Sequence, residues 1–222
     1  MFFNKTKTKR INYLEHDKLR PFVGNFMKES RYGHTLAMEG EAEKLADIFG
    51  KSKDIDFINK LKSAVILHDI TKELSAEQHY EICEKYRIKL SDEDKAIEKV
   101  LHAKTAAHIA AIEFGADDER VFWGIYNHTL GGTKNFSLFA KIIYLADYIE
   151  PTRTFIDCIE VRKYFYGKIT EARNSKDKLR ILDETVLYSL NKTLEALIKD
   201  NLLIHSEAVK CRNNFIDVLS HH

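Results

Sequence analysis

The sequence predicts an all-α fold. Only two prolines and nine glycines occur among 222 residues, which leaves few of the turn-forming residues that a sheet protein needs. Apolar residues recur at helical spacing in one segment after another, and no segment shows the strict alternation of a half-buried strand. We therefore expect a bundle of about eight helices, in a single domain over residues 1–222 whose first residues, 1–12, are flexible.

Helical patterning falls in a regular series of segments along the chain, and we count about eight helices among them. In order, they are residues 15–29, 31–49, 56–68, 75–86, 91–102, 103–114, 117–128, 137–150, 157–166, 177–199 and 207–219. Pro21 and Gly24 weaken the first segment. Gly50, Gly115 and Pro151 mark ends, since glycine and proline commonly follow the last turn of a helix.

Capping residues give the helix starts. Ser75 with Gln78 forms a capping-box pattern, in which the serine side chain and the glutamine side chain each satisfy a backbone amide at the start of the helix. Single polar residues with a short side chain predict the other N-caps. These are Asp56, Ser91, the pair Asp117-Asp118, and Ser137.

Composition excludes several classes of function. Lysine plus arginine number 35 and aspartate plus glutamate 34, so no overall field favours nucleic acid or a membrane surface. No apolar stretch approaches 18 residues, so we expect no membrane span. The basic run over residues 5–10 is more typical of a solvated tail than of an RNA-binding arm. Three scattered cysteines without a CxxC motif predict reduced thiols in a cytoplasmic protein.

The chain is organised around residues 64–72, with the sequence AVILHDITK. An apolar helical run ends in the adjacent pair His68-Asp69. Burying that carboxylate is costly unless a cation is paired with it. Four other potential ligands also follow apolar helical runs or lie near their ends, namely His34, His102, His128 and Asp147. Each residue alone is more often structural. Together, four imidazoles and two carboxylates can supply a centre of two transition-metal ions.

The segments around these residues resemble the HD-domain superfamily of metal-dependent phosphohydrolases. Within it, the chain is similar to the YqeK-type branch of symmetrical diadenosine tetraphosphate hydrolases. The matching segments are residues 31–35 (RYGHT), 67–72 (LHDITK), 100–102 (VLH), 128–131 (HTLG), 142–153 (IIYLADYIEPTR), 203–205 (LIH) and 212–213 (RN). The chain departs from the family pattern after His102, His128 and His205.

The resemblance implies a fold, an activity and a set of roles. It implies an HD-domain helical bundle and an acid anhydride hydrolase, a symmetrical bis(5'-nucleosyl)-tetraphosphatase, in which a metal-activated hydroxide cleaves diadenosine tetraphosphate into two ADP. Its core ligands would be His34, His68, Asp69 and Asp147, and His102 and His128 would hold a second metal with Asp69 as the bridge. The family's metal is expected to be iron, in a di-iron centre, with manganese, cobalt or nickel as other candidates.

Charged residues near the ligands complete the predicted site. Arg31, Lys72 and Glu150 each stand three residues from a ligand, a spacing that shares one helix face. We assign Asp69, Lys72 and Glu150 to catalysis, with Lys72 also binding phosphate. The other substrate-binding candidates are Arg31, Thr129, Arg153, His205 and Arg212.

Other interpretations remain open. The same centre would serve a nucleotidase or phosphodiesterase acting on another nucleotide, or a nucleotide-binding sensor with slow turnover. The partners expected are the dinucleotide and ADP, without membrane or nucleic acid, and a homodimer is compatible with the sequence. We expect the aromatic residues Phe122, Trp123 and Tyr126 in the core. The remaining histidines His16, His79 and His108 are interpreted as surface or incidental residues.

Overall fold

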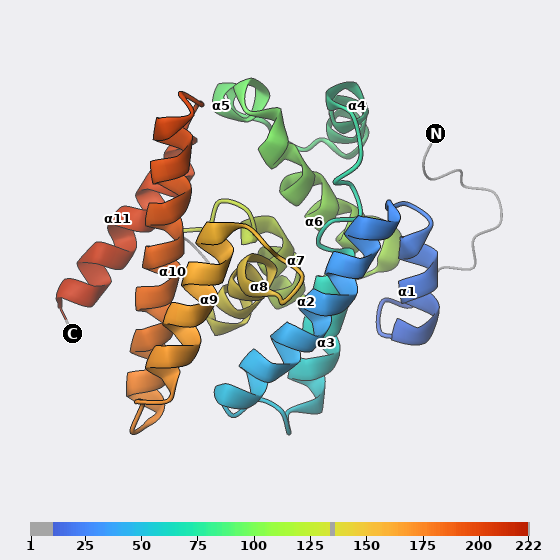
Figure 1. Ribbon diagram of the computed structural model, residues 1–222. Coiled ribbons are helices and arrows are strands. Elements are labelled where there is room, and N and C mark those ends of the chain that lie inside the picture. Colours follow the sequence, from blue (N-terminus) through green and yellow to red (C-terminus); the bar gives the residue numbers. More distant parts are fainter. Residues whose placement is uncertain (1–10, 134–135, 222) are drawn as a thin grey trace.

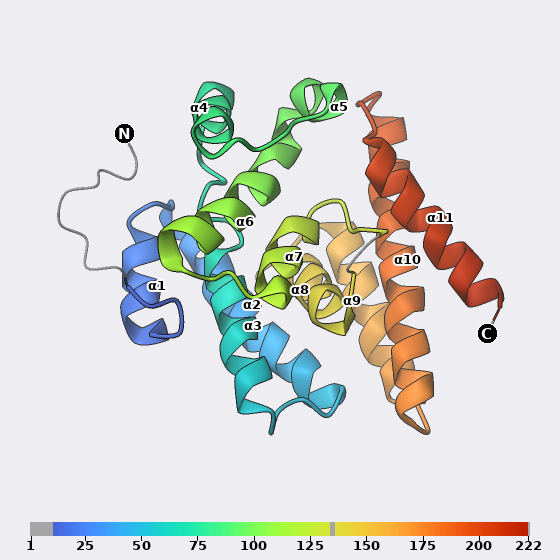
Figure 2. The same cartoon turned by 180° about the vertical axis from the view of Figure 1, so that it is seen from behind.

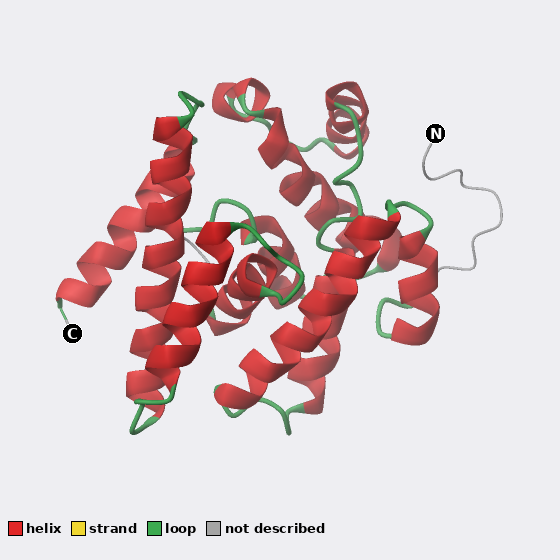
Figure 3. Ribbon diagram, viewed as in Figure 1, coloured by secondary structure: helices red, strands yellow, loops and turns green. Residues whose placement is uncertain are grey.

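A computed structural model describes residues 11–133 and 136–221 of the chain (Figure 1). Helices and connecting loops make up all of the described part, which contains no strand (Figure 3). The all-α prediction is therefore confirmed. The basic run over residues 5–10, and most of the N-terminal segment predicted to be flexible, lie outside the described residues.

The described residues form eleven α-helices and one 3-10 turn, which is more than the eight or so predicted. They are α1 (His16–Gly24), α2 (Glu29–Ile48), α3 (Ile55–Leu67), α4 (Ala76–Tyr86), α5 (Asp92–Ala96), η1 (Glu98–Val100), α6 (Leu101–Phe114), α7 (Glu119–Asn127), α8 (Leu138–Ile149), α9 (Ile156–Ile169), α10 (Ser175–Lys199) and α11 (Ser206–Ser220). The segment predicted as 91–102 breaks after Ala96, and its last two residues begin α6 instead.

The helix starts follow the caps read from the sequence, with one exception. Ser75 and Ser91 both form capping boxes, and the side chains of Asp118 and Ser137 accept backbone amides as predicted. Asp56 is not the N-cap of α3. Asp54 takes that position and accepts the Phe57 amide.

The first predicted helix is shorter than expected. It ends at Gly24 rather than continuing to residue 29, with Pro21 inside it. A side chain at Gly24 would meet the ring of Tyr32 at 3.3 Å, so the glycine lets α1 and α2 approach closely where the chain turns between them.

Three helices, α3, α7 and α8, form the centre of the bundle. Helix α2 packs against α3 and α8, α6 packs against α7, and α9, α10 and α11 pack in succession on the other side (Figures 1 and 2). Helices α7 and α8 touch at Gly124, where a Cβ atom would clash with the Cδ1 atom of Ile143. This close crossing brings the C-terminal ends of α7 and α8 to the same side of the core as the end of α3.

The core is apolar and continuous from α1 to α11. Helix α8 is its most buried element, with eight of its twelve residues inaccessible or nearly so. The prediction that the aromatic residues of α7 belong to the core is only partly right. All three are half-buried, and Phe122 and Tyr126 pack on the core's edge whereas Trp123 does not. Cys83, Cys158 and Cys211 are free, buried thiols. None of the described helices has the length and apolarity that spanning a membrane requires.

Candidate metal centre

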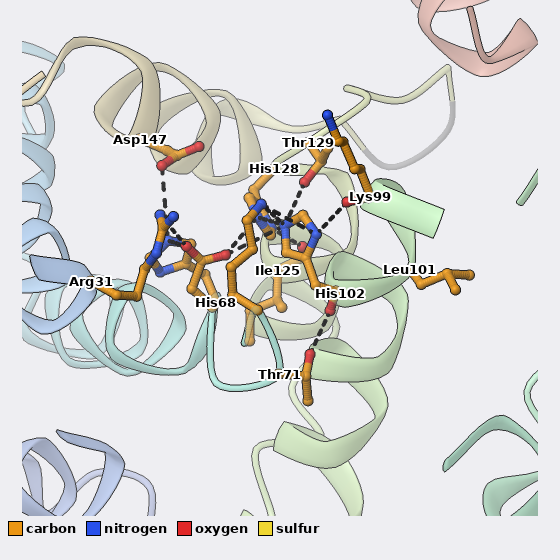
Figure 4. A network of polar contacts seen from close by, with 12 residues as sticks. Arg31, His68, Thr71, Lys99, Leu101, His102, Ile125, His128, Thr129 and Asp147 are labelled. Carbon is orange, nitrogen blue, oxygen red and sulfur yellow. Dashed lines mark hydrogen bonds and ion pairs between the residues drawn. The ribbon is translucent and has the colours of Figure 1, made fainter. Parts of the chain in front are cut away.

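Five helices deliver the predicted ligands to one place. His34 lies on α2, and Asp147 lies in the last turn of α8. His68 and His128 are the C-cap residues of α3 and α7, and His102 is the second residue of α6. Figure 4 shows that the side chains of His68, His102, His128 and Asp147 converge between these elements. The side chain of His34 contacts that of Asp147 in the same place. Residues that are far apart in the sequence thus lie together in one cluster.

The first group of donors is His34, His68 and Asp147. The Nε2 atom of His34 lies 2.9 Å from Oδ1 of Asp147, and the Nε2 atom of His68 lies 3.9 Å from the same oxygen. One ligand atom from each of the three residues lies within 4.8 Å of the other two. That spacing suits a single metal ion between them.

The second group is arranged around Asp69, which is 2% exposed. Its Oδ1 atom lies 3.4 Å from Nε2 of His102 and 3.5 Å from Nε2 of His128. Its Oδ2 atom faces the other way, 3.3 Å from Nε2 of His68. The two oxygens of one carboxylate therefore point at two different sets of imidazoles.

The four histidines are all held by their outer ring nitrogen. The Nδ1 atoms of His68, His102 and His128 each donate to the backbone carbonyl three residues earlier, at 2.6, 2.7 and 2.6 Å. A carbonyl oxygen can only accept, so these hydrogen bonds place the proton on Nδ1. They leave Nε2, the atom that faces the centre, free to bind a metal.

The atoms inside the centre are arranged as they would be around a bound cation. The Nε2 atoms of His102 and His128 stand 3.0 Å apart, and in the tautomer described above they direct lone pairs at each other. Within the described residues, Nε2 of His34, Nε2 of His68 and Oδ1 of Asp69 are buried without a hydrogen-bond partner. Buried polar atoms without partners are costly. The nitrogen and oxygen donors, and the helix C-termini that carry partial negative charge, fit transition-metal ions.

Burial and neighbouring charges set the protonation states. Burial alone raises the pKa of Asp69, but the surrounding imidazoles, His68 first, outweigh it and hold the pKa well below its usual value. Burial likewise raises the pKa of Asp147, and His34 and Arg153 reverse the effect. Burial and then Lys72 depress the pKa of His102 well below its usual value. The carboxylates are thus ionised and His102 is neutral, the forms that bind metal.

Three basic side chains surround the donors. Nη1 of Arg31 lies 2.9 Å from Oδ2 of Asp69, and Nη2 of Arg153 lies 2.7 Å from Oδ1 of Asp147. The Nζ atom of Lys72 lies 2.9 Å from Nε2 of His102, and burial lowers the pKa of this lysine. The structure brings together all three cations that the sequence placed near the ligands.

Glu150 lies behind His34 rather than facing the pocket. Its Oε1 atom accepts from Nδ1 of His34 at 3.0 Å, and its own oxygens also accept from the amide and hydroxyl of Thr152. Glu150 does not share a helix face with Asp147 as its spacing predicted. Helix α8 ends at Ile149, and Glu150 has extended backbone, with ψ of 149°. Glu150 therefore fits the role of a positioning residue for a ligand, rather than the catalytic role predicted.

Replacing Glu150 by glutamine is expected to weaken metal binding. The change keeps the shape but removes the charge that orients and polarises His34, and losing such a partner costs roughly 10–100-fold in metal affinity. A metal-buffer titration measures the loss. Glu160→Gln, at an ion pair with Lys192, is the matched control. Equal affinities in the two variants would refute the positioning role.

A buried polar network supports the backbone around His102, and the sequence interpretation missed it. Thr71 donates to the His102 carbonyl at 2.9 Å and contacts Thr105, which in turn contacts Nδ1 of His79 at 2.9 Å. His79 is 4% exposed, so its interpretation as a surface residue is wrong. Its burial comes from the packing of α4 on α6, which no local pattern reveals. In the sequence, this network could have been suspected from Thr71 and Thr105, which each follow a predicted ligand by three residues.

The stability of the metal-free protein should fall as pH drops from about 6.5 toward 4. Burial and Lys72 lower the pKa of His79 to about 4, so the folded state resists a proton that the unfolded chain accepts. The loss from His79 alone should be about 2 kcal/mol by pH 5, within a maximum of about 3 kcal/mol. Urea unfolding with chelator present measures it. The stability gap between wild type and His79→Gln should narrow by that amount, and parallel curves would contradict the assignment.

The remaining predicted residues fall in different places. The hydroxyl of Thr129 lies 3.0 Å from Nε2 of His102, at the centre. His205 caps α11 and contacts Oδ1 of Asp94 at 3.2 Å, at a cavity next to the centre. Arg212 is not brought to either place, because it bonds Asn191 and Asn213 on the α10–α11 face.

Comparison with known proteins shows a family match and similar relatives. Residues 31–152 match the HD domain family. A Staphylococcus aureus protein named "Bis(5'-nucleosyl)-tetraphosphatase, symmetrical" is 27% identical over 199 residues, 90% of this chain and 93% of that one. A Halalkalibacterium halodurans protein with the same name is 31% identical over 205 residues, 91% of this chain and 98% of that one.

A solved structure is similar over nearly the whole chain. It comes from Clostridium acetobutylicum and is described as a predicted HD superfamily hydrolase involved in NAD metabolism. It shares 32% sequence identity with a TM-score of 0.78, and the match covers 91% of this chain and 97% of that chain.

Proposed function

This chain belongs to the HD domain family, and we propose that it is a metal-dependent hydrolase that cleaves diadenosine tetraphosphate symmetrically into two ADP. Two of its relatives carry the name of a symmetrical tetraphosphatase and align with it over almost their full lengths. The observation that carries the proposal is the carboxylate of Asp69, whose two oxygens face separate imidazole sets in a centre flanked by Arg31, Lys72 and Arg153.

The residues that would hold the metals are the six predicted ones. His34, His68 and Asp147 would hold one ion, His102 and His128 another, and Asp69 would contact both. Ions held there lower the pKa of water and neutralise phosphate oxygens. Iron is the metal we propose, because imidazole and carboxylate donors suit it, and they suit manganese, cobalt and nickel as well.

The chain's own cations would bind and orient the polyphosphate. Arg31 and Arg153 present guanidinium groups beside the two carboxylate ligands, and such groups form paired hydrogen bonds with phosphate. Lys72 adds a half-buried point charge close to His102. Water adds to one of the two inner phosphorus atoms, and the P–O bond to the central bridging oxygen breaks. ADP leaves as a stable anion, which lessens the need for a general acid.

Product analysis tests this proposal. The metal-loaded protein is incubated with diadenosine tetraphosphate, and the products are separated by ion exchange. ADP as the sole product supports the proposal. ATP with AMP would mean asymmetrical cleavage, and no turnover with iron or manganese supplied would refute the activity. Cleavage of mononucleotides or cyclic nucleotides in preference would favour a nucleotidase or phosphodiesterase instead.

Two further expectations accompany the proposal. The free, buried state of all three cysteines supports a cytoplasmic location, since an oxidising compartment favours disulfides. A homodimer stays a prediction, which sedimentation of the purified protein would test.

A further inference from the structure

A cavity of about 810 Å³ lies next to the metal centre, between α5 and α6 on one side and the start of α11 on the other. Its lining includes Val100 and Ala103, which flank the ligand His102, and Asn127, which precedes the ligand His128. The volume is in the range of cavities that enclose a small organic ligand. A molecule in this cavity would therefore lie beside the two chain segments that carry His102 and His128.

The floor of the cavity is a tight glycine turn. Gly131 has φ of +68°, and a side chain there would meet the Sγ atom of Cys211 at 2.6 Å. A side chain at Gly132 would meet the Asn127 amide at 2.7 Å. Larger residues at either position would have to displace α11 or the end of α7. The two glycines thus keep the turn beside His128 close to its neighbours and leave the space above it open.

One wall of the cavity is aromatic. Trp123 and Tyr126 stand three residues apart on α7, with ring centroids 5.3 Å apart at 69°. Trp123 is the only tryptophan of the chain, and it does not belong to the hydrophobic core. A half-buried indole against a cavity, rather than against the core, offers a flat apolar surface to a ligand.

The charges of the cavity are balanced, unlike those of the metal centre. Its lining contains three lysines and three carboxylates. Lys104 pairs with Asp94 at 2.6 Å, and Lys210 pairs with Glu207 at 2.8 Å. These pairs neutralise the cations that would otherwise attract phosphate. The phosphates of a ligand would therefore prefer the centre, where Arg31, Lys72 and Arg153 gather, and its uncharged part would prefer the cavity.

We propose that this cavity binds one nucleoside unit of the substrate, with the base stacked on Trp123. The inference rests on the proposed function, because it places one adenosine of the dinucleotide in the cavity and its phosphates on the metal centre. Stacking on an aromatic side chain accepts any base, since every base has a π-face. The cavity therefore favours nucleotides over inorganic polyphosphate without selecting strongly among bases.

The single tryptophan gives a direct test of ligand binding. ADP added to the metal-loaded protein should change the emission of Trp123 in a saturable manner. Inorganic pyrophosphate, which carries phosphates but no base, should leave the emission unchanged at concentrations that block hydrolysis. An equal change with both ligands, or no change at ADP concentrations that inhibit the enzyme, would overturn the proposal.

Substitution of Trp123 provides a second test that does not depend on fluorescence. Trp123→Ala should weaken ADP binding, measured by calorimetry, by about 5- to 150-fold, the range that corresponds to loss of one base–aromatic stack. Trp123→Phe retains an aromatic face and should keep most of the affinity. Tyr164→Ala, at a half-buried aromatic pair with Tyr188 on the α9–α10 face, is the matched control.

The outcomes separate the two proposals. If Trp123→Ala binds ADP as tightly as wild type while diadenosine tetraphosphate is still cleaved to ADP, the nucleoside site is refuted and the activity stands. If the dinucleotide is not cleaved, but ADP binds and Trp123→Ala weakens it, the activity is refuted and the site stands.

Discussion

Replacing Asp69 by alanine or asparagine is expected to abolish hydrolysis and to lower the amount of bound metal. Among the described residues, Asp69 is the one carboxylate placed between the two imidazole sets. Its loss would remove the proposed ligand of both ions and would free Arg31 from its partner. Turnover should fall by roughly 10³-fold or more, since removing even one electrostatic contact to the reacting group costs about 10²–10³. Elemental analysis and product chromatography measure the two effects.

Asp183→Asn is the control for Asp69. Asp183 also pairs with a basic residue, Lys141, in a partly buried contact, but it does so between α8 and α10 and away from the centre. Its replacement should leave metal content and turnover near the wild-type values. If Asp69→Asn retained both metals and lost only activity, Asp69 would not be a bridging ligand, and its role would lie with the substrate.

Removing the metals is expected to lower the thermal stability of the wild-type protein markedly. In the metal-free state, the centre contains facing lone pairs and buried atoms without partners among the described residues. A ligand at about 100 times its dissociation constant stabilises the folded state by about 2.7 kcal/mol, which for a chain of this size corresponds to roughly 5–10 °C in Tm. Calorimetry with and without chelator measures the difference.

The reference for this experiment is Asp69→Asn treated in the same way. The variant should melt at nearly the same temperature with and without chelator, because its centre holds little metal. Re-addition of iron or manganese should restore the wild-type Tm but not alter that of the variant. A wild-type Tm that does not respond to chelator would show that the ions contribute nothing to the fold.

Much of the fold was predictable because its signals are local. An N-cap needs only a short polar side chain and the amides of the next turn, and so Ser75, Ser91 and Ser137 mark starts correctly. Near Asp56 the local rule was ambiguous, since Asp54 meets the same requirement two residues earlier. Each of the eleven helices overlaps one of the predicted segments, but the count of about eight was too low, because a short helix such as α5 merges with its neighbours in the apolar pattern.

The predicted ligand residues could be identified in the sequence from their chemistry. The roles of the residues near them could not. Histidine and aspartate following apolar helical runs are unusual enough to stand out in sequence, and the side chains of all six residues converge. Glu150 was misplaced because its direction depends on where α8 stops. Trp123 was expected in the core with the other aromatic residues of α7, but whether an aromatic face meets the core or a cavity depends on the distant α11.

The ligands come from positions as far apart as 34 and 147, on helices that must all be in place at once. During synthesis, His68 and Asp69 leave the ribosome long before Asp147, and the chain made by then offers only a partial donor set. The complete centre can form only after α8 has emerged and docked against α2 and α3. Metal binding by the complete set of proposed ligands would therefore be a late event in the life of each new chain, and it would require that the helices from both ends of the centre have packed correctly.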